Sequence, residues 1–156
     1  MIIRRAVPAD AAAMAGILNT IIAIGGTTAH EVPKSVEVVQ RDYVEGPDVL
    51  SCMVADDGGQ VIGWQSVGLW QGEAHIGTFV QPGIQARGIG AGLFAVTCDL
   101  LRQVGIKAII ASIRADNVPG LAYYAHIGFT DTHAEPDFAL SDGRIVGRIH
   151  RRFDLV

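Results

Sequence analysis

Two glycines that follow a predicted strand could bind an anion through the backbone. Gly88 and Gly90 belong to the stretch QARGIGAGL (residues 85–93), which precedes an apolar run typical of a buried helix face. The N–H groups at a helix start lack partners within the helix, and the helix dipole is positive there. Missing Cβ atoms let phosphate oxygens approach these groups. A turn that requires positive φ, with close packing at Gly92, would explain the same glycines equally well.

Two common nucleotide-binding patterns fit this stretch poorly. A P-loop has Lys and then Ser or Thr after its last glycine, whereas this chain continues with Ala91-Gly92-Leu93. A dinucleotide-binding turn has its first glycine directly after the strand and an acidic residue about 20 positions later. Here residues 82–84 intervene, and residues 109–113 contain no acidic side chain. Both patterns are therefore disfavoured.

The composition is that of one compact domain spanning residues 1–156. Hydrophobic residues make up 49% of the chain and the net charge is −4, which argues against disorder and against a nucleic-acid partner. No apolar run approaches the ~20 residues of a membrane span, and the N-terminus shows no secretory pattern. Cys52 and Cys98 lie in apolar segments without the spacing of metal ligands. We expect a cytoplasmic protein with no membrane partner and no metal.

Hydrophobic periodicity predicts an alternation of strands and helices. Met14, Ile17, Leu18, Ile21 and Ile22 form one face of a first helix, for which Asp10 is the expected N-cap. Asp-Gly between two apolar runs predicts a hairpin near residue 57. The expected strands cover residues 2–6, 49–55, 61–70, 73–80, 106–113, a segment from 129, and 144–156; the expected helices start near residues 10, 35, 88 and 117. The order is β-α-α-β-β-β-α-β-α-β-β, an α/β fold with a mixed sheet.

Two blocks of sequence resemble the GNAT N-acetyltransferase superfamily. Phe79-Val-Gln-Pro82 followed by Gln85-Ala-Arg-Gly-Ile-Gly90 resembles its acetyl-CoA signature, and Asn117, Tyr124 and Gly128-Phe129 resemble a second element. The predicted element order agrees over essentially the whole chain. The resemblance implies a single GNAT domain with a mixed, mostly antiparallel sheet of about six to seven strands and about four helices. The start Ile-Arg-Arg-Ala and the Thr-rich loop after the first helix are similar to phosphinothricin-type small-molecule acetyltransferases.

The resemblance implies an enzyme that transfers an acetyl group from acetyl-CoA directly to the amine of a small molecule, an amino acid or a related amine. Tyr124 would protonate the departing thiolate, and Val80 N–H would polarise the thioester carbonyl. Tyr123 points about 100° away from Tyr124 on a helix, so only one of the two can serve. The residues expected at the cofactor are Phe79, Val80, Gln85, Ala86, Arg87, Gly88, Ile89, Gly90 and Asn117.

The amine must lose a proton before it attacks. At pH 7 this costs about 4.6 kcal/mol for a lysine-like amine and about 1 kcal/mol for an α-amino group. Glu73 and His75 share one face of their strand and are the candidate bases. In phosphinothricin-type enzymes the suggested base is a glutamate, and the corresponding position here is His75, so the choice between the two stays open.

The acceptor pocket is expected to involve Thr27, Thr28, His30, Trp64 and Trp70. No acidic cluster suited to a polyamine accompanies them. The alternative function is a GNAT-fold module that binds acyl-CoA without catalysis, and the presence of Tyr124 and a candidate base favours the enzyme. The resemblance is compatible with a homodimer, although no residue requires one.

Overall fold

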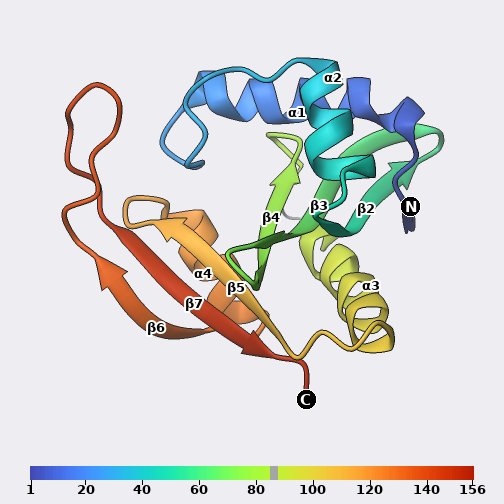
Figure 1. Cartoon of the computed structure of the whole chain (residues 1–156). Coiled ribbons are helices and arrows are strands. Elements are labelled where there is room, and N and C mark those ends of the chain that lie inside the picture. The colour runs from blue at the N-terminus through green and yellow to red at the C-terminus, as the bar shows by residue number, and fades with distance from the viewer. Residues whose placement is uncertain (85–87) are drawn as a thin grey trace.

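The computed structural model describes residues 1–84 and 88–156. Its elements, coloured along the chain in Figure 1, follow the predicted order. The strands are β1 (Ile2–Arg5), β2 (Val49–Asp57), β3 (Gln60–Trp70), β4 (Glu73–Val80), β5 (Ala108–Arg114), β6 (Thr130–Glu135) and β7 (Arg148–Asp154). The helices are η1 (Pro8–Asp10), α1 (Ala11–Ile24), α2 (Val36–Val39), the π-helical segment η2 (Gln40–Glu45), α3 (Ile89–Gln103) and α4 (Val118–His126).

All seven strands form one sheet in the order β1-β2-β3-β4-β5-β7-β6. Every neighbouring pair is antiparallel except β4 and β5, which are parallel. The predicted hairpin joins β2 to β3, where Asp56 Oδ1 accepts a hydrogen bond from Gly59 N at 2.7 Å. The prediction of a mixed, mostly antiparallel α/β fold is therefore confirmed.

Helices cover both faces of the sheet, and β2 and β3 are covered on both. α1 and α2 lie over β2–β4, and Met14 and Leu18 of α1 share a core with Trp64 of β3. α3 and α4 lie on the other face, where Leu101 and Tyr124 pack with residues of β5. In Figure 1, α1 and α2 lie above β4, whereas α4 lies behind β5. On β5, β6 and β7, the residues that face the α1 side are mostly polar.

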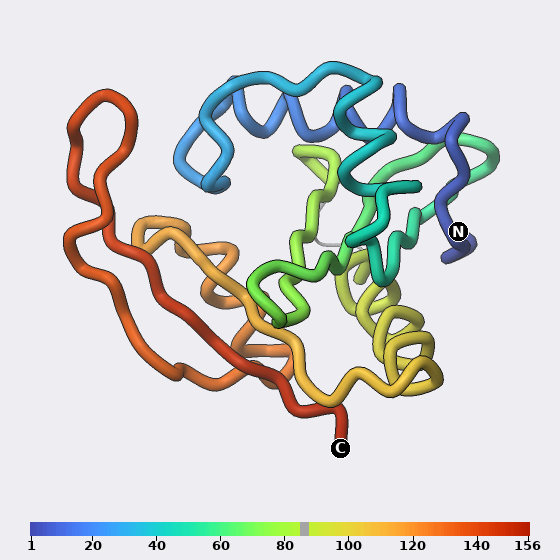
Figure 2. Tube along the Cα trace, viewed as in Figure 1, coloured from blue at the N-terminus to red at the C-terminus, as the bar shows by residue number. Residues whose placement is uncertain are grey.

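The parallel strands β4 and β5 share a single residue pair, His75 with Ile110. Beyond this pair the two strands separate, as the traces in Figure 2 show. β4 continues for five residues to Val80 and β5 for four residues to Arg114. Backbone groups on the facing edges of these segments are therefore available to a ligand.

Two local predictions need correction. Asp10 does not cap α1 through its side chain; its carboxylate accepts a hydrogen bond from Val7 N at 2.8 Å and pairs with Arg4, which holds the pKa of that carboxyl below its usual range. The segment that begins at Ser35 is not one regular helix, because α2 passes into the π-helical η2. Ser35 does cap α2, since its Oγ accepts a hydrogen bond from Val38 N.

The two cysteines are free and buried, as predicted, and burial raises the pKa of both thiols. Within residues 1–84 and 88–156, every helix is too short or too polar to cross a membrane.

Candidate active site

A groove of about 810 Å³ lies between the end of β4 and α4. Thr78, Phe79 and Val80 of β4 line one side of it. The opposite side consists of residues in and before α4, among them Asn117, Tyr123 and Tyr124. Residues from the end of α1 and the loop that follows, including Thr27 and Thr28, also border the groove. The structure therefore brings four of the predicted parts of the site to one groove: the end of β4, the start of α3, Asn117 and Tyr124.

The direction of the β4 backbone decides which of its groups face this groove. Gln81 N donates to Ile62 O of β3 at 2.9 Å, so residue 81 points its N–H toward β3. Successive residues of a strand point their backbone groups to opposite edges. The N–H groups of Thr78 and Val80 therefore face the gap between β4 and β5, whereas that of Phe79 faces β3. Of the two β4 residues predicted to bind the cofactor, Val80 offers its backbone and Phe79 offers its side chain.

At the start of α3 the backbone of Gly88 is open, whereas Ile89 and Gly92 are packed against the core. Gly88 precedes the helix at φ 71°, and a Cβ at this residue would meet nothing within 4 Å. Ile89, which was expected at the cofactor, has a fully buried side chain in the core, so only its backbone is available. Gly92 packs at ordinary distance against Ile3. Gly88 therefore fits both explanations of the glycines: its φ is positive, and the space beside its backbone is open to an anion. The predicted cofactor ligands Gln85, Ala86 and Arg87 lie outside the described residues.

Gly90 lines the groove but has no free space for a side chain. A Cβ at Gly90 would lie 2.6 Å from Cε1 of Tyr123, and the Tyr123 hydroxyl donates to Gly90 O at 2.8 Å. The space that the missing side chain leaves is therefore occupied by the Tyr123 ring. Gly90 positions the helix start against α4 and does not itself form an open cradle.

Both tyrosines of α4 reach the same polar cluster. The Tyr124 hydroxyl lies 3.0 Å from Thr78 Oγ1, and the Tyr123 hydroxyl accepts from Gln65 Nε2 at 3.1 Å. Gln65 Nε2 also donates to Thr78 Oγ1 at 3.0 Å. The Tyr123 proton is engaged by Gly90 O, whereas the Tyr124 hydroxyl and Thr78 can exchange donor and acceptor roles. Tyr124 is therefore the better proton donor.

Desolvation keeps both hydroxyls protonated. Burial raises the pKa of Tyr123 to about 12, with opposing effects from hydrogen bonds to Gln65 and Thr78. Burial also raises the pKa of Tyr124 well above the ordinary value for a phenol. A protonated hydroxyl beside the gap is what a general acid requires.

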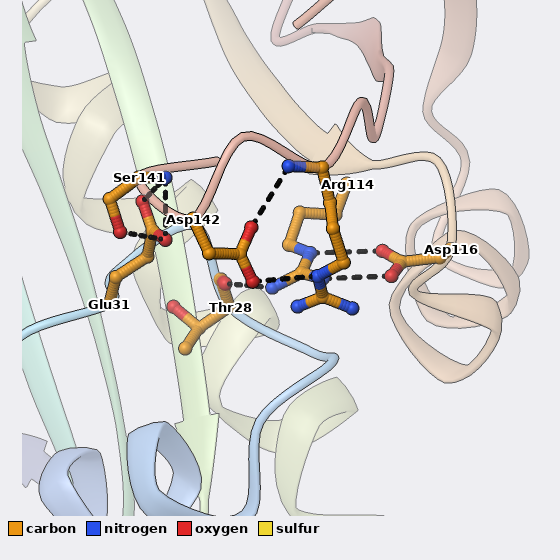
Figure 3. Close-up of polar contacts among 7 residues, drawn as sticks. Thr28, Glu31, Arg114, Asp116, Ser141 and Asp142 are labelled. Atoms are coloured by element: carbon orange, nitrogen blue, oxygen red, sulfur yellow. Dashed lines mark hydrogen bonds and ion pairs between the residues drawn. The ribbon is translucent and has the colours of Figure 1, made fainter. Parts of the chain in front are cut away.

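Asn117 caps α4 and fastens the loop after α1. Its Oδ1 accepts from Gly120 N at 2.9 Å, and its Nδ2 donates to Thr27 O at 2.7 Å. The neighbouring Thr28 O accepts from Arg114 Nη1 at 3.2 Å (Figure 3). Arg114 is buried and is paired with Asp116 at 2.8 Å. The predicted acceptor residues Thr27 and Thr28 are thus held at the groove by two side chains from the β5–α4 connection.

A second contact ties this loop to the β6–β7 connection. Glu31 accepts hydrogen bonds from the backbone N–H and the hydroxyl of Ser141, the latter at 2.8 Å (Figure 3). His30, next to Glu31, is half-buried, with its Nε2 3.3 Å from the Tyr43 hydroxyl and its ring near Phe79. Burial is the main cause that lowers the pKa of His30. His30 therefore lies on the α1 side of the sheet and not among the residues that line the groove.

Neither predicted tryptophan lines the groove. Trp64 is fully buried; its Nε1 donates to Met14 O at 3.1 Å and its ring packs on Phe79. Trp70 is 61% exposed at the β3–β4 hairpin and contacts His75. Trp64 is therefore a core residue, and Trp70 lies at the opposite end of β4 from Val80.

The candidate bases Glu73 and His75 also lie toward the hairpin end of β4. Glu73 is exposed at the first position of the strand, about 16 Å along the chain direction from Thr78. His75 is half-buried, with its ring against Trp70, and its Nε2 is buried without a hydrogen-bond partner among the described residues. Burial lowers the pKa of His75, and Glu73 partly opposes this shift. The structure thus separates Glu73 from Tyr124 and leaves His75 about 10 Å from Thr78 along the strand.

Sequence reasoning missed a set of polar residues on the α1-side face of β5, β6 and β7. The strand expected over residues 144–156 is present as β7, Arg148–Asp154, but the sequence analysis assigned no role to its polar side. In the sheet, Arg148 lies opposite Arg114 and Glu135, and His150 lies opposite Ser112 and His133. The missed residues on this face are Ser112, Glu135, Arg148 and His150. Gln65 and Thr78, which contact the tyrosines of α4 on the opposite face, were missed as well. The alternation of side chains along β7 could have shown that Arg148 and His150 share one face. Only the strand order places that face beside β5.

Comparisons with known proteins agree with this geometry. Residues 22–129 match the model of the Acetyltransferase (GNAT) family. The chain is 28% identical over 153 residues to the L-methionine sulfoximine/L-methionine sulfone acetyltransferase of Salmonella typhimurium, covering 92% of this chain and 88% of that protein. It is 29% identical to the L-amino acid N-acyltransferase MnaT of Escherichia coli, with the same coverage.

Solved structures share the fold. An acetyltransferase of Salmonella typhimurium, yncA, solved with its cofactor acetyl-CoA, has a TM-score of 0.84 at 22% identity and covers 99% of this chain and 94% of its own. The phosphinothricin acetyltransferase of Sinorhizobium meliloti in complex with acetyl-CoA has a TM-score of 0.81 at 20% identity, with 98% and 87% covered. The family match and these relatives confirm the prediction of an acyltransferase: the chain belongs to the Acetyltransferase (GNAT) family.

Proposed function

We propose that this protein transfers an acetyl group from acetyl-CoA directly to the amine of a small molecule, an amino acid or a related amine. The observation that carries the proposal is the gap between β4 and β5. Among the described residues, no strand pairing engages the Thr78 and Val80 N–H groups on its β4 edge, and the Tyr124 hydroxyl lies beside it. The named activities of the Salmonella and Escherichia coli relatives support an acceptor of the amino-acid class.

The residues around the gap suit a thioester. The N–H groups of Thr78 and Val80 would donate to the carbonyl and amide oxygens of an extended acyl-pantetheine arm, which would lie along β4 like another strand. Since the Tyr124 hydroxyl contacts Thr78 Oγ1, the sulfur is expected level with Thr78. Thr78 N–H is then the donor to the thioester carbonyl, and Val80 N–H binds further along the arm. This revises the assignment of the carbonyl to Val80.

Two more groups would hold the rest of acetyl-CoA. The N–H groups at the start of α3, beside the open Gly88, are suited to the diphosphate. Asn117 would border the arm, although both atoms of its amide are already engaged by Gly120 and Thr27. Acetyl-CoA supplies the activated acetyl group, and Tyr124 returns a proton to the departing thiolate.

Arg148 is suited to bind the carboxylate of an amino acid acceptor. Seven other arginines of the described chain form ion pairs with aspartates, whereas Arg148 has no carboxylate within ion-pairing distance among the described residues. Its Nε is buried without a hydrogen bond, again within that part of the chain, and its guanidinium lies 3.6 Å above the Phe138 ring. Desolvation lowers the pKa of Arg148. A half-buried cation held in place by an aromatic ring is a natural partner for a small anion.

The proposal is tested by measuring CoA thiol release with a panel of amines. The panel pairs each amino acid with the amine that lacks its carboxylate. We expect turnover with amino acids and lower kcat/KM with their decarboxylated partners. Tight binding of acetyl-CoA without any thiol release above hydrolysis would instead support a binding module. Equal turnover within each pair would refute the carboxylate site and leave the acetyltransferase activity standing.

A further inference from the structure

A chain of hydrogen bonds crosses three strands on the α1-side face of the sheet. Ser112 Oγ of β5 lies 2.8 Å from His150 Nδ1 of β7, and His150 Nε2 lies 2.5 Å from Glu135 Oε1 of β6. An ionised carboxylate can only accept hydrogen bonds, so Nε2 carries the imidazole proton and Nδ1 of the neutral ring accepts from the Ser112 hydroxyl. The His133 ring stacks on that of His150 at 4.3 Å, which restricts its rotation.

The inner end of this chain lies at the gap. Ser112 is two residues beyond Ile110, the last β5 residue paired with β4, and faces the same side of the sheet as His75. Ser112 is therefore level with Gly77 and Thr78 of β4. Tyr124 approaches Thr78 from the opposite face, where α4 packs. An amine that attacks the thioester from the α1 side would meet Ser112, while the leaving sulfur faces Tyr124.

The outer end of the chain reaches solvent. The side chains of His150 and Glu135 are 12% and 50% exposed, so a proton that arrives at this pair can pass to water. The predicted base His75 is not part of this chain, and its Nε2 has no hydrogen-bond partner among the described residues. The hydrogen-bonded chain is thus a route from the gap to solvent on this face.

We propose that Ser112, His150 and Glu135 remove the proton of the acceptor amine, a role that rests on the acetyltransferase function proposed above. The ammonium N–H donates to Ser112 Oγ, and the Ser112 proton moves to His150 Nδ1. His150 then carries both ring protons and returns one from Nε2 to Glu135 or water. The amine lone pair forms the C–N bond, the C–S bond breaks, and the thiolate takes the Tyr124 proton. Ser112 is the catalytic residue of this step, and His150 and Glu135 are positioning residues that act through it.

Several titratable or charged side chains lie on the same face of the sheet as His150. They are His75 on β4, Arg114 on β5, His133 and Glu135 on β6, and Arg148 and Arg152 on β7 itself. Arg114 and Arg152 are each paired with an aspartate. Among these groups, Glu135 makes the direct hydrogen bond to the ring.

The test compares pH profiles of Ser112→Ala and His150→Gln with that of the unsubstituted enzyme, at pH values below and above the pKa of the acceptor amine. Below that pKa we expect kcat/KM to fall by about 100-fold, the usual size of a proton-transfer contribution. Above it the amine is already neutral, so the loss should shrink to within a few-fold. Thr130→Ala, which changes an exposed residue of β6 outside the hydrogen-bonded chain, serves as the control and should keep the profile.

The outcomes separate the relay from the proposed function. Losses of equal size at all pH values, or full activity of both variants, overturn the relay and leave the transferase activity intact. Absence of thiol release by the unsubstituted enzyme with every amine overturns both. If His150→Gln does not fold, Ser112→Ala gives the same comparison, because it removes only one half-buried hydroxyl.

A metal ion is the competing role for the same residues. Ligand atoms of His133, Glu135 and His150 lie within 4.8 Å of one another. Activity that disappears after dialysis against a chelator and returns with Zn²⁺ would overturn the relay. Unchanged activity after chelation is the expected result.

Discussion

The hydroxyl of Tyr123 on α4 donates to the carbonyl oxygen of Gly90 in the first turn of α3, and its ring fills the space beside that glycine. A methyl group at Gly90 would collide with the ring. We therefore expect Gly90→Ala to cost about 1–3 kcal/mol of unfolding free energy, as overpacking does, and to weaken acetyl-CoA binding by displacing the helix start. Chemical denaturation and calorimetric titration measure the two effects.

Replacing Tyr123 tests whether its ring causes the destabilisation expected for Gly90→Ala. In a Tyr123→Ala background the ring is absent, so Gly90→Ala should add little further destabilisation, and the two changes should be strongly non-additive. Additive effects would show that the Tyr123 ring is not what excludes a side chain at Gly90. Gly88→Ala is a contrasting case, because only its positive φ opposes the substitution.

Tyr124→Phe should lower kcat by about 100-fold or more and leave the Kd for acetyl-CoA nearly unchanged. The substitution removes the proton donor but keeps the ring that packs against Phe129. Tyr123→Phe is the matched control: it should keep most of kcat while losing about 1 kcal/mol of stability, since Gly90 O and Gln65 lose a partner. Steady-state kinetics with a saturating acceptor makes the comparison, and a normal kcat for Tyr124→Phe would remove its acid role.

Arg148→Met should raise KM for amino acids by about 10-fold or more, which is the usual contribution of a charge-assisted hydrogen bond. KM for the matched amines that lack a carboxylate should not change. Stability should be retained or increased, because the substitution removes a half-buried charge that has no ion-pair partner among the described residues. Equal KM changes for both members of a substrate pair would contradict carboxylate recognition by Arg148.

Stability should fall as the pH drops below about 6.5. Burial lowers the folded-state pKa of His30 and His75 below the unfolded value. The unfolded chain therefore binds protons first, and stability is lost from the unfolded pKa downward until the folded pKa is passed. Asp10, whose pKa is also lowered, has its effect in a more acidic range, from its ordinary value near 3.8 downward.

His75→Gln tests this assignment. Urea midpoints measured between pH 7.5 and 5 should vary less for this variant than for the unsubstituted protein. His133→Asn is a surface control and should retain the original pH dependence. An unaltered slope in His75→Gln would mean that His75 makes no contribution to the acid sensitivity.

The element order could be predicted from sequence because local signals determine it. Periodic apolar residues define α1 and α3, β4 has the bounds that were predicted for it, and Asn117 caps a helix as expected. The position of Tyr124 relative to Asn117 follows from helical geometry. These features depend on residues that are close together along the chain.

The remaining parts of the site depend on contacts between distant segments. Sequence spacing placed Trp64 at the substrate, but its environment is set by α1, which is 50 residues away. Ser112, His150 and Glu135 come from strands that are neighbours only because β7 inserts between β5 and β6. A parity pattern identifies one face of a strand but cannot say which strand that face will meet.

One residue pair joins the N-terminal four strands to the C-terminal three. An extended ligand in the gap would supply the main-chain bonds that β4 and β5 do not make with each other, and so would act as an eighth strand at the centre of the sheet. The proposed donor substrate would thereby complete the hydrogen-bond network of the fold, and amide hydrogen exchange should slow in both β4 and β5 when it binds.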